Sequence, residues 1–530
     1  MSAFPKSVSP IYSLRRGYFR FLSSALLVAA FLFGGRSATA QETCSDLATL
    51  RLPDVRIVEA AVIEPGGQGN ETGDAPHCRV EGVIGREIRF ELLLPETWNG
   101  RFAMGGGGGF VGSIQNAARW SVHSGYATVG TDTGHEGGGT DASWALHHPE
   151  RQINFGHLAV HRTAETAKAI IRAHYGSDID YSYFLGCSRG GGQALMEAQR
   201  YPGDFDGISS GAPAFDWTGI MAENFQNMQK LYPDPTRTGT PPLSPDHLYF
   251  LEKAVLDECD ALDGVRDRVM EDPRMCPFDI ASLPTCTGDA DEGASLCFTG
   301  EQLEALRTVY APPVNEEGPL YVGFPFGGEG TPAGWINWIT GKFEGLYRDS
   351  GETAPSLQWA FAMNYAKYLV FADPDWDYAG YDFSSWEQDA SYASAFMDAT
   401  DPDLSDFAGK GHKLVLWHGW SDAALSALAS IRYFEEAERL DPDVRDYFRL
   451  FMMPGVLHCG GGPGPAEVNW LTVLTDWVEE GKAPERIVAL KRNFDREVVR
   501  SRPLCPWPQR AVYDGEGDTD DADSFACAAP

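Results

Sequence analysis

Ser188 lies between Gly186 and Gly190 in a segment that could place a reactive hydroxyl on a sharp turn. An apolar run at 181–185 precedes it, and a helix-like run at 193–201 follows and stops at a proline. This order of strand, turn and helix is typical of a nucleophile elbow, in which the glycines allow a strained backbone. Because the short pattern also occurs by chance in long chains, other residues must support it.

The order of three residues along the chain supports a serine hydrolase. Serine attacks a carbonyl only when a base accepts its proton and an acid orients that base. In α/β hydrolases the order is Ser, then Asp or Glu, then His. Ser188, Asp422 and His458 have this order, and each follows an apolar strand and begins a glycine-rich loop. We therefore predict Ser188 as nucleophile, Asp422 as the orienting acid and His458 as base.

Other histidines and aspartates compete for these roles. The rival bases are His412 and His418, and the rival acids are Asp401, Asp403 and Asp406. None of them combines the end of a predicted strand with the required order along the chain. For any one of the histidines, the alternative interpretation is a structural residue whose hydrogen bonds are satisfied within the protein.

The 10 cysteines are even in number, which indicates disulfides in an exported chain. Sequence order suggests four local pairs: Cys44–Cys78, Cys259–Cys276, Cys286–Cys297 and Cys505–Cys527. This leaves Cys187 and Cys459, which adjoin Ser188 and His458. Since a disulfide holds two Cα atoms about 5.5–6 Å apart, a Cys187–Cys459 bond would hold nucleophile and base together. The alternatives are free buried thiols or pairing with other cysteines.

Five consecutive glycines at 105–109 follow a predicted strand at 101–104. Glycine lets the backbone approach a ligand closely. No Gly-Lys-Ser/Thr sequence follows, so we favour an oxyanion loop over a phosphate loop or a flexible linker. We expect the oxyanion hole to be formed by the backbone N–H groups of Arg189 and Gly108.

A second cluster, Asp260, Asp263 and Asp267 around Gly264, could bind a hard cation through oxygen ligands. Its spacing is not that of an EF-hand, and an acidic loop in an acidic protein is the alternative.

The elements that must position these residues alternate between strands and helices, a pattern that predicts an α/β fold with a parallel sheet. Strands are expected at 126–130, 181–185, 207–210, 413–417 and 447–453, and helices at 156–175, 193–201, 426–440 and 468–480. Residues 80–94 are predicted to form strands at an antiparallel edge of the sheet, whereas residues 41–79 are predicted to be rich in turns. The alternation stops at about 215–408, which we interpret as an inserted domain.

The N-terminus resembles a signal peptide, with a basic region, an apolar run at 21–33 and a small-residue cleavage site before Gln41. A membrane anchor is the alternative. Removal of residues 1–40, which contain five basic and no acidic residues, would take the net charge from −33 to −38. Such a charge argues against nucleic-acid binding and against docking on anionic membranes.

The motifs at 186–191, 418–422 and 458–459 resemble those of the tannase and feruloyl esterase family. Further segments with this resemblance lie at 107–112, 132–135, 211–213 and 373–376. The resemblance implies an α/β-hydrolase fold whose two catalytic parts, 41–214 and 409–530, flank a lid at 215–408. It also implies a disulfide between the neighbours of the serine and the histidine.

By the same resemblance, structural calcium in the lid would be bound by the carboxylates of Asp260, Asp263 and Asp267 and the carbonyls of Val265 and Val269. Arg268 departs from the family, which often has glycine there. No organic cofactor is expected.

The predicted function is that of a secreted or periplasmic serine esterase acting on small feruloyl, galloyl or terephthaloyl esters. Lid aromatics could contact the acyl ring or form lid core: Trp359, Phe361, Tyr365, Tyr368 and Phe371. A terephthalate monoester would favour a cation opposite its free carboxylate, with Arg348 as a candidate. The alternatives are another hydrolase with the same triad, such as a peptidase, and a calcium-stabilised binding protein.

Overall fold

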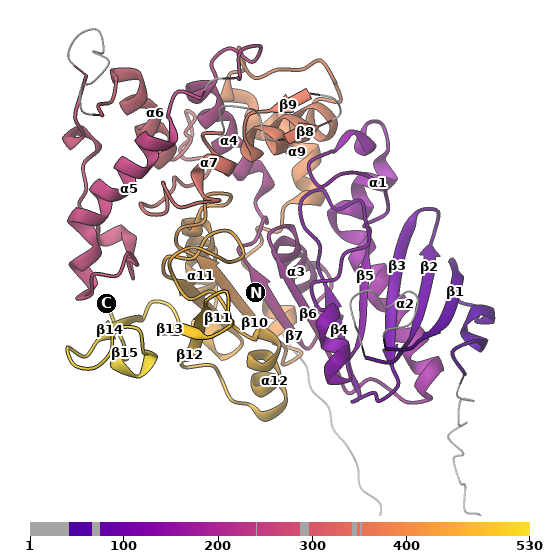
Figure 1. Cartoon of the computed structure of the whole chain (residues 1–530). Helices are drawn as coiled ribbons and strands as arrows, with labels where there is room; N and C mark the ends of the chain where they lie inside the picture. Colours follow the sequence, from indigo (N-terminus) through magenta and orange to yellow (C-terminus); the bar gives the residue numbers. More distant parts are fainter. Residues whose placement is uncertain (1–41, 66–74, 240, 287–295, 342–346, 350–351) are drawn as a thin grey trace, which may run out of the picture. The chain divides into compact units, whose positions relative to one another are not determined.

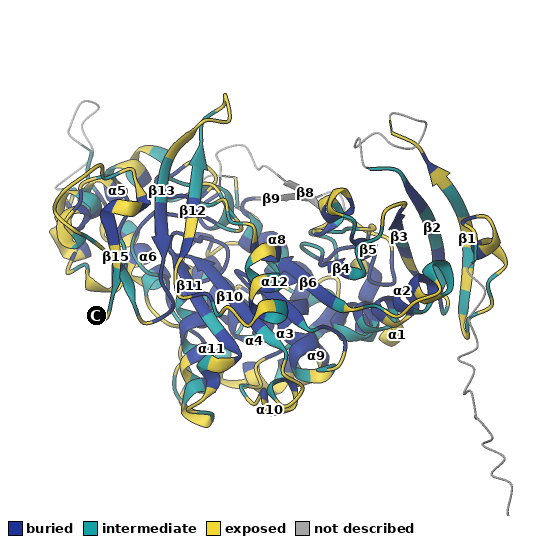
Figure 2. Ribbon diagram, turned by 90° about the horizontal axis from the view of Figure 1, so that it is seen from below, coloured by how far each residue is buried: buried dark blue, intermediate teal, exposed yellow. Residues whose placement is uncertain are grey.

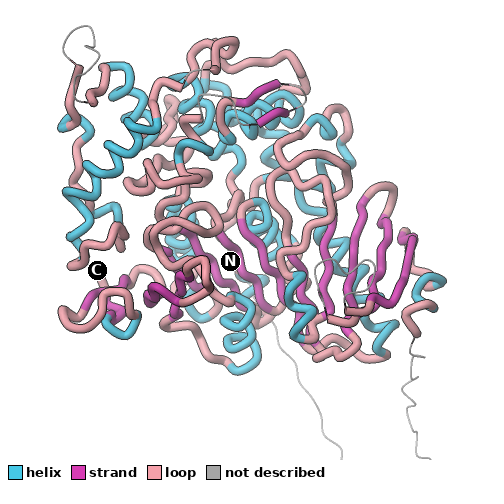
Figure 3. Tube along the Cα trace, viewed as in Figure 1, coloured by secondary structure: helices cyan, strands magenta, loops and turns pink. Residues whose placement is uncertain are grey.

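A nine-stranded sheet organises the chain, in the order β1-β2-β3-β5-β4-β6-β7-β10-β11 (Figures 1 and 3). The computed structural model describes residues 42–65, 75–239, 241–286, 296–341, 347–349 and 352–530. These belong to one unit, Ala40–Pro530. The predicted signal peptide at 1–40 lies outside the described residues.

One edge of the sheet is antiparallel. It contains β1 (Val55–Ile63), β2 (His77–Ile84) and β3 (Ile88–Pro95), and β3 also pairs antiparallel with β5 (Ala127–Thr131). The strands expected within 80–94 are present, but the prediction of turns throughout 41–79 is wrong because β1 lies there. Most residues of this edge strand keep some solvent exposure (Figure 2). Val58 and Val62 are exposed, so apolar and polar residues do not alternate along the strand.

The rest of the sheet is parallel, as the strand–helix alternation predicts. Its strands are β4 (Arg101–Gly105), β5, β6 (Tyr181–Cys187), β7 (Gly207–Gly211), β10 (Lys413–Gly419) and β11 (Phe448–Met453). Their side chains alternate between two cores. Leu414 and Leu416 belong to the core that contains residues of α2, α3 and α11, whereas Val415 and Trp417 belong to the core that contains residues of α12. These helices are α2 (Ala159–Tyr175), α3 (Arg189–Arg200), α11 (Ala427–Leu440) and α12 (Trp470–Glu480). The fold is therefore the α/β-hydrolase type of layered sheet.

The chain between β7 and β10 is mainly helical. Its helices are α4 (Trp217–Leu231), α5 (Pro245–Cys259), α6 (Gly300–Tyr310), α7 (Trp335–Trp338), α8 (Leu357–Tyr365), α9 (Trp386–Met397) and α10 (Ser405–Ala408). A short pair, β8 (Tyr347–Asp349) and β9 (Glu352–Ala354), lies among them. In Figure 1, α4, α5, α6 and α7 lie above the sheet. The predicted lid limits, 215–408, enclose these helices and remain a prediction.

The C-terminal part forms two hairpins that the sequence analysis did not predict. They are β12 (Ile487–Arg492) with β13 (Val498–Leu504), and β14 (Arg510–Tyr513) with β15 (Phe525–Ala528). The acidic stretch at 514–523 connects β14 to β15. Among the described residues, every helix is too short or too polar to cross a membrane.

Candidate active site

Ser188 lies on the turn between β6 and α3 with φ 63° and ψ −123°. A positive φ is uncommon for a residue with a side chain and marks a strained turn. The neighbouring backbone is packed so closely that a Cβ on Gly186 would lie 2.2 Å from the carbonyl oxygen of Gly190. Glycine at Gly186 is therefore a steric requirement of this turn.

The side chains of Ser188, His458 and Asp422 form one hydrogen-bonded series. Nε2 of His458 lies 2.8 Å from Oγ of Ser188, and Nδ1 of His458 lies 2.8 Å from Oδ2 of Asp422. They follow the ends of β6, β10 and β11, three strands of the parallel run β6-β7-β10-β11. The carboxyl ends of such strands meet at one edge, so residues 270 positions apart in sequence come together.

Asp422 is buried and held by several donors. Its Oδ1 accepts the N–H groups of Ala424 at 2.8 Å and Leu425 at 3.1 Å. Burial by itself raises the pKa of the Asp422 carboxyl, but His458 and His418 outweigh this effect, so the net pKa lies below its usual range. Asp422 is therefore placed to remain an anion beside the imidazole of His458.

The rival histidines and aspartates do not take the places of His458 and Asp422 in this hydrogen-bonded series. His418 reaches the same Asp422 oxygen at 3.2 Å, but its other nitrogen bonds Oγ of Ser430, not Ser188. His412 bonds the carbonyl of Pro202 at 2.9 Å. The three rival acids, Asp401, Asp403 and Asp406, are exposed.

All five predicted disulfides are present. The pairs are Cys44–Cys78, Cys187–Cys459, Cys259–Cys276, Cys286–Cys297 and Cys505–Cys527. The Cα atoms of Cys187 and Cys459 are 5.9 Å apart across a sequence separation of 272 residues. This bond ties the turn that carries Ser188 to the loop that carries His458.

The glycine loop approaches Ser188, but Gly108 is a poor oxyanion donor in this geometry. Its N–H donates to Oε1 of Gln115 at 2.8 Å. Gly109, by contrast, lines the same cavity as Ser188, Arg189 and His458. The structure therefore favours Gly109 over Gly108 as the partner of Arg189, and this assignment remains a prediction.

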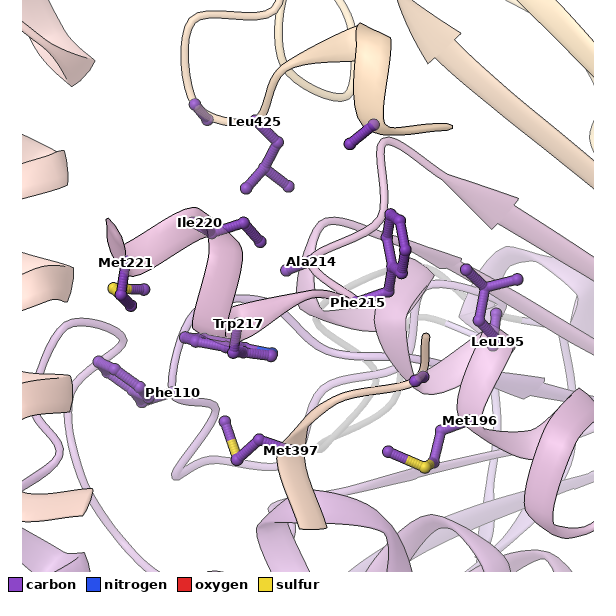
Figure 4. Close-up of a cluster of buried hydrophobic side chains, with 14 of the residues drawn as sticks. Phe110, Leu195, Met196, Ala214, Phe215, Trp217, Ile220, Met221, Met397 and Leu425 are labelled. Carbon is purple, nitrogen blue, oxygen red and sulfur yellow. The ribbon is translucent and has the colours of Figure 1, made fainter. Parts of the chain in front are cut away.

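The cavity next to Ser188 has largely apolar walls. Its wall residues include Trp217, Ile220, Met221, Trp338, Phe361 and Leu425, several of which are seen in Figure 4. Trp338 packs edge-on against His458, with ring centroids 5.0 Å apart. These walls can enclose an aromatic group.

Of the lid aromatics singled out from sequence, Phe361 lines this cavity. Tyr365 stacks on Trp217 at 5.8 Å and belongs to the core, as does the buried Trp359. The side chain of Arg348 lies outside the described residues. The sequence analysis missed the wall residues Trp217 and Trp338, because no local pattern shows which side of a helix between β7 and β10 faces the serine.

The predicted calcium ligands lie in one loop after α5. Asp260 accepts the N–H of Arg268 at 2.8 Å, and Asp263 accepts that of Val265 at 3.0 Å, while Asp267 faces Arg500 and Arg502.

Burial, with a further contribution from Asp267 and Asp260, raises the pKa of Asp263 to about 6. Carboxylate oxygens are ligands that calcium prefers, but Asp267 is already paired with two arginines, so calcium binding at this loop remains a prediction. Arg268 has φ 65°, a conformation that favours glycine.

Comparison with known proteins identifies related chains. The profile of the family described as tannase and feruloyl esterase matches residues 72–528. An uncharacterized esterase of Xanthomonas campestris pv. campestris is 34% identical over 549 residues, which cover 93% of this chain and 92% of the relative.

Two further proteins carry more specific names. The mono(2-hydroxyethyl) terephthalate hydrolase of Piscinibacter sakaiensis is 35% identical over 517 residues, covering 86% of this chain and 85% of the relative. The crystal structure of feruloyl esterase B from Aspergillus oryzae has a TM-score of 0.79 at 26% identity, covering 92% of this chain and 99% of that one.

Proposed function

We propose, from the premise that this chain belongs to the tannase and feruloyl esterase family and is a carboxylic ester hydrolase, that it cleaves esters of aromatic acids through an acyl-enzyme on Ser188. The observation that carries this proposal is the hydrogen-bonded series Ser188–His458–Asp422, whose serine and histidine line a largely apolar cavity.

Each residue of the series has a distinct task in this proposal. Oγ of Ser188 attacks the ester carbonyl while Nε2 of His458 takes its proton. Asp422 accepts the Nδ1–H of His458, which fixes the tautomer and stabilises the imidazolium that forms. The tetrahedral oxyanion is bound by the backbone N–H of Arg189 and a second N–H from the glycine loop.

Collapse of this intermediate completes the acylation step. His458 passes its proton to the leaving alcohol, and the ester of Ser188 remains. Water then attacks that ester with His458 again as base, and the aromatic acid leaves. The apolar walls of the cavity hold the acyl ring in position for both steps.

The test is acid release from methyl ferulate, methyl gallate and mono(2-hydroxyethyl) terephthalate, with Ser188→Ala as the matched variant. We expect turnover of at least one ester and a loss of about 10⁴-fold or more in Ser188→Ala. Equal rates for the two proteins on all three esters and on a simple acetate ester would refute the proposal.

Two other functions make different predictions in the same assay. A peptidase with this series would also cleave amide analogues of the substrates, whereas an esterase would cleave only the esters. A non-catalytic binding protein would retain the aromatic acids without turning over any ester.

We also propose structural calcium at the loop of Asp260, Asp263 and Asp267, with the carbonyls of Val265 and Val269 as further ligands. Calcium bound there would offset the carboxylate charges and stabilise the loop. We assign it no part in the reaction.

Export is the third proposal. Residues 1–40 have the composition of a signal peptide. The five disulfides support an oxidising compartment for the mature chain. N-terminal sequencing of the exported protein tests this, and a mature chain that begins at Gln41 is the expected result.

A further inference from the structure

A histidine and two carboxylates lie together outside the catalytic series. His161 lies on α2, Glu197 lies on α3, and Asp204 lies in the segment that follows α3. Each offers one atom that can bind a metal ion, and these three atoms lie within 4.8 Å of one another. The reaction at Ser188 uses none of the three side chains.

Glu197 is the member of this group that lacks a partner. Its side chain is buried, with the residue 1% exposed, and neither carboxylate oxygen has a hydrogen-bond partner among the described residues. Burying a carboxylate without a donor or a cation is costly. A bound species that contacts these oxygens would therefore stabilise the fold.

The nearby donors are engaged with Asp204. Nδ1 of His161 lies 2.7 Å from Oδ2 of Asp204. The ammonium group of Lys168 donates to the backbone carbonyl of Asp204. Neither group supplies Glu197 with the hydrogen bond that it lacks.

Tyr201 fixes the ring of His161. The two rings stack with their centroids 4.0 Å apart and their planes 7° apart, and the Tyr201 hydroxyl lies 2.6 Å from Nδ1 of His157. The side chain of His161 keeps 29% of its surface exposed, whereas that of Asp204 keeps 8%. The imidazole is thus the accessible member of the group, through which an ion would enter.

The charges of the group leave room for a cation. Glu197 and Asp204 bring two negative charges, and the buried Lys168 brings one positive charge. A protonated His161 would offset the charge of Asp204, to which it is bonded, but would leave Glu197 without a donor. A divalent ion bound by all three ligands would instead contact both carboxylates.

The donor set indicates the class of ion. Zinc binds imidazole nitrogen and carboxylate oxygen, whereas calcium takes about six to eight oxygen ligands. Zinc–ligand bonds of about 2.1 Å place the ligand atoms of a tetrahedral site about 3.4 Å apart. Since the three atoms already lie within 4.8 Å of one another, each would move by less than about 1 Å to bind the ion. Water would take the fourth position.

We propose that His161, Glu197 and Asp204 bind a divalent metal ion of the zinc class, which joins α2 to the C-terminal end of α3 and to the segment that follows it. The ion replaces the hydrogen bond between His161 and Asp204 and gives Glu197 a partner. Its role is structural, and it is independent of the proposed function and of the proposed calcium loop. Because the imidazole nitrogen must be unprotonated to bind, affinity falls as the pH drops.

The experiment titrates Zn²⁺ into the protein after chelation of bound metals and saturation with CaCl₂, which fills the proposed calcium loop first. Isothermal titration calorimetry is expected to show one tightly bound zinc ion per chain. The melting temperature is expected to rise by several degrees on addition of Zn²⁺, because the ion binds the folded chain in preference to the unfolded one.

Two variants locate the site. Glu197→Gln retains the size of the side chain and removes its charge. His161→Gln changes the more exposed ligand, so it decides the question if Glu197→Gln does not fold. Each should weaken zinc binding by about 100-fold or more, because one of three protein ligands is lost. The matched control, His148→Gln, alters an exposed histidine and should bind zinc as the wild type does.

The outcomes are distinct. Zinc binding that is lost in His161→Gln and kept in His148→Gln supports the site. A calcium-saturated wild type that binds no zinc, or zinc binding that His161→Gln leaves unchanged, overturns it. A zinc-free Glu197→Gln that melts above a wild type unable to bind zinc would assign the missing partner to a proton shared by Glu197 and Asp204 instead.

Discussion

Cys187 and Cys459 are bonded to each other, and each is the direct chain neighbour of a residue in the hydrogen-bonded series, Ser188 and His458. The bond joins the end of β6 to the loop after β11, two strands that are not adjacent in the sheet. This one covalent bond therefore restrains the positions of Ser188 and His458 relative to each other.

Removal of this disulfide should lower the activity of each folded molecule in addition to lowering stability. In the variant Cys187→Ala/Cys459→Ala, Ser188 and His458 lose their shared constraint, and a displacement of about 1 Å can cost on the order of 100-fold in rate. Closing a loop of 272 residues also contributes about 5.6 kcal/mol to stability in the chain-entropy account. We expect kcat per folded molecule to fall about 10- to 100-fold, measured with a methyl ester after quantifying folded protein by circular dichroism.

The matched control is Cys505→Ala/Cys527→Ala, which removes a disulfide of the C-terminal hairpins. Its shorter loop corresponds to about 3 kcal/mol. This variant should melt earlier than the wild type but keep its kcat per folded molecule. Equal losses of kcat in the two double variants would show that the Cys187–Cys459 bond has no special role at the site.

Phe361 is predicted to bind the acyl ring. It lines the cavity and stacks with Trp338 at a centroid distance of 6.2 Å. Phe361→Ala removes one aromatic wall, so kcat/KM for methyl ferulate should fall about tenfold or more relative to that for methyl acetate.

Phe371→Ala provides the comparison, because Phe371 stacks on Trp376 at 4.7 Å and is not among the cavity residues. Its ratio of ferulate to acetate activity should match the wild type. The acyl-site assignment is refuted if both variants change this ratio equally.

The residues of the site were predictable where chemistry demands a particular residue type at a particular position. Ser188, Asp422 and His458 each follow an apolar strand, and Cys187 and Cys459 adjoin two of them, so the sequence carries local signals for all five. The positions of the parallel strands could also be predicted from the sequence, because strands that are buried on both faces form continuous apolar runs.

The cavity walls and the oxyanion loop were not predictable in the same way. Helix α8 is buried on nearly all sides, so its sequence has no distinct apolar face that would show which of its residues line the cavity. Within the run of glycines, the difference between Gly108 and Gly109 depends on the side chain of Gln115. Such distinctions come from tertiary packing.

Calcium should raise the melting temperature of the wild type. A ligand that binds the native state at 100 times its Kd stabilises it by about 2.7 kcal/mol, which corresponds to a shift of several degrees. We expect the chelated protein to regain this shift on addition of CaCl₂, measured by differential scanning calorimetry. In Asp263→Asn the shift should be lost.

The control for this prediction is Asp375→Asn, which alters an exposed carboxylate outside the loop of Asp260, Asp263 and Asp267. It should respond to calcium as the wild type does. A wild-type melting temperature that is the same with chelator and with CaCl₂ would refute calcium binding at Asp263.

His135 should make the protein sensitive to mild acid. It is 2% exposed, stacks on Trp144 at 3.6 Å, and its Nε2 bonds the carbonyl of Phe110, directly after the glycine loop, at 2.8 Å. Burial lowers the pKa of His135 to about 4. Between pH 6.5 and 4 the unfolded chain therefore binds a proton that the folded chain excludes, so stability is greatest above pH 6.5 and falls as the pH drops to about 4.

The size of this effect follows from the shift of the pKa. At about 1.4 kcal/mol per pH unit, His135 should reduce the free energy of unfolding by about 3 kcal/mol between pH 6.5 and pH 4. Urea unfolding across this range measures it, with His135→Gln expected to show a flatter dependence and His148→Gln, at an exposed histidine, the wild-type dependence. A dependence that His135→Gln leaves unchanged would assign the acid sensitivity to another group. Because His135 supports the backbone next to Gly109, activity should decline over the same pH range in which this stability is lost.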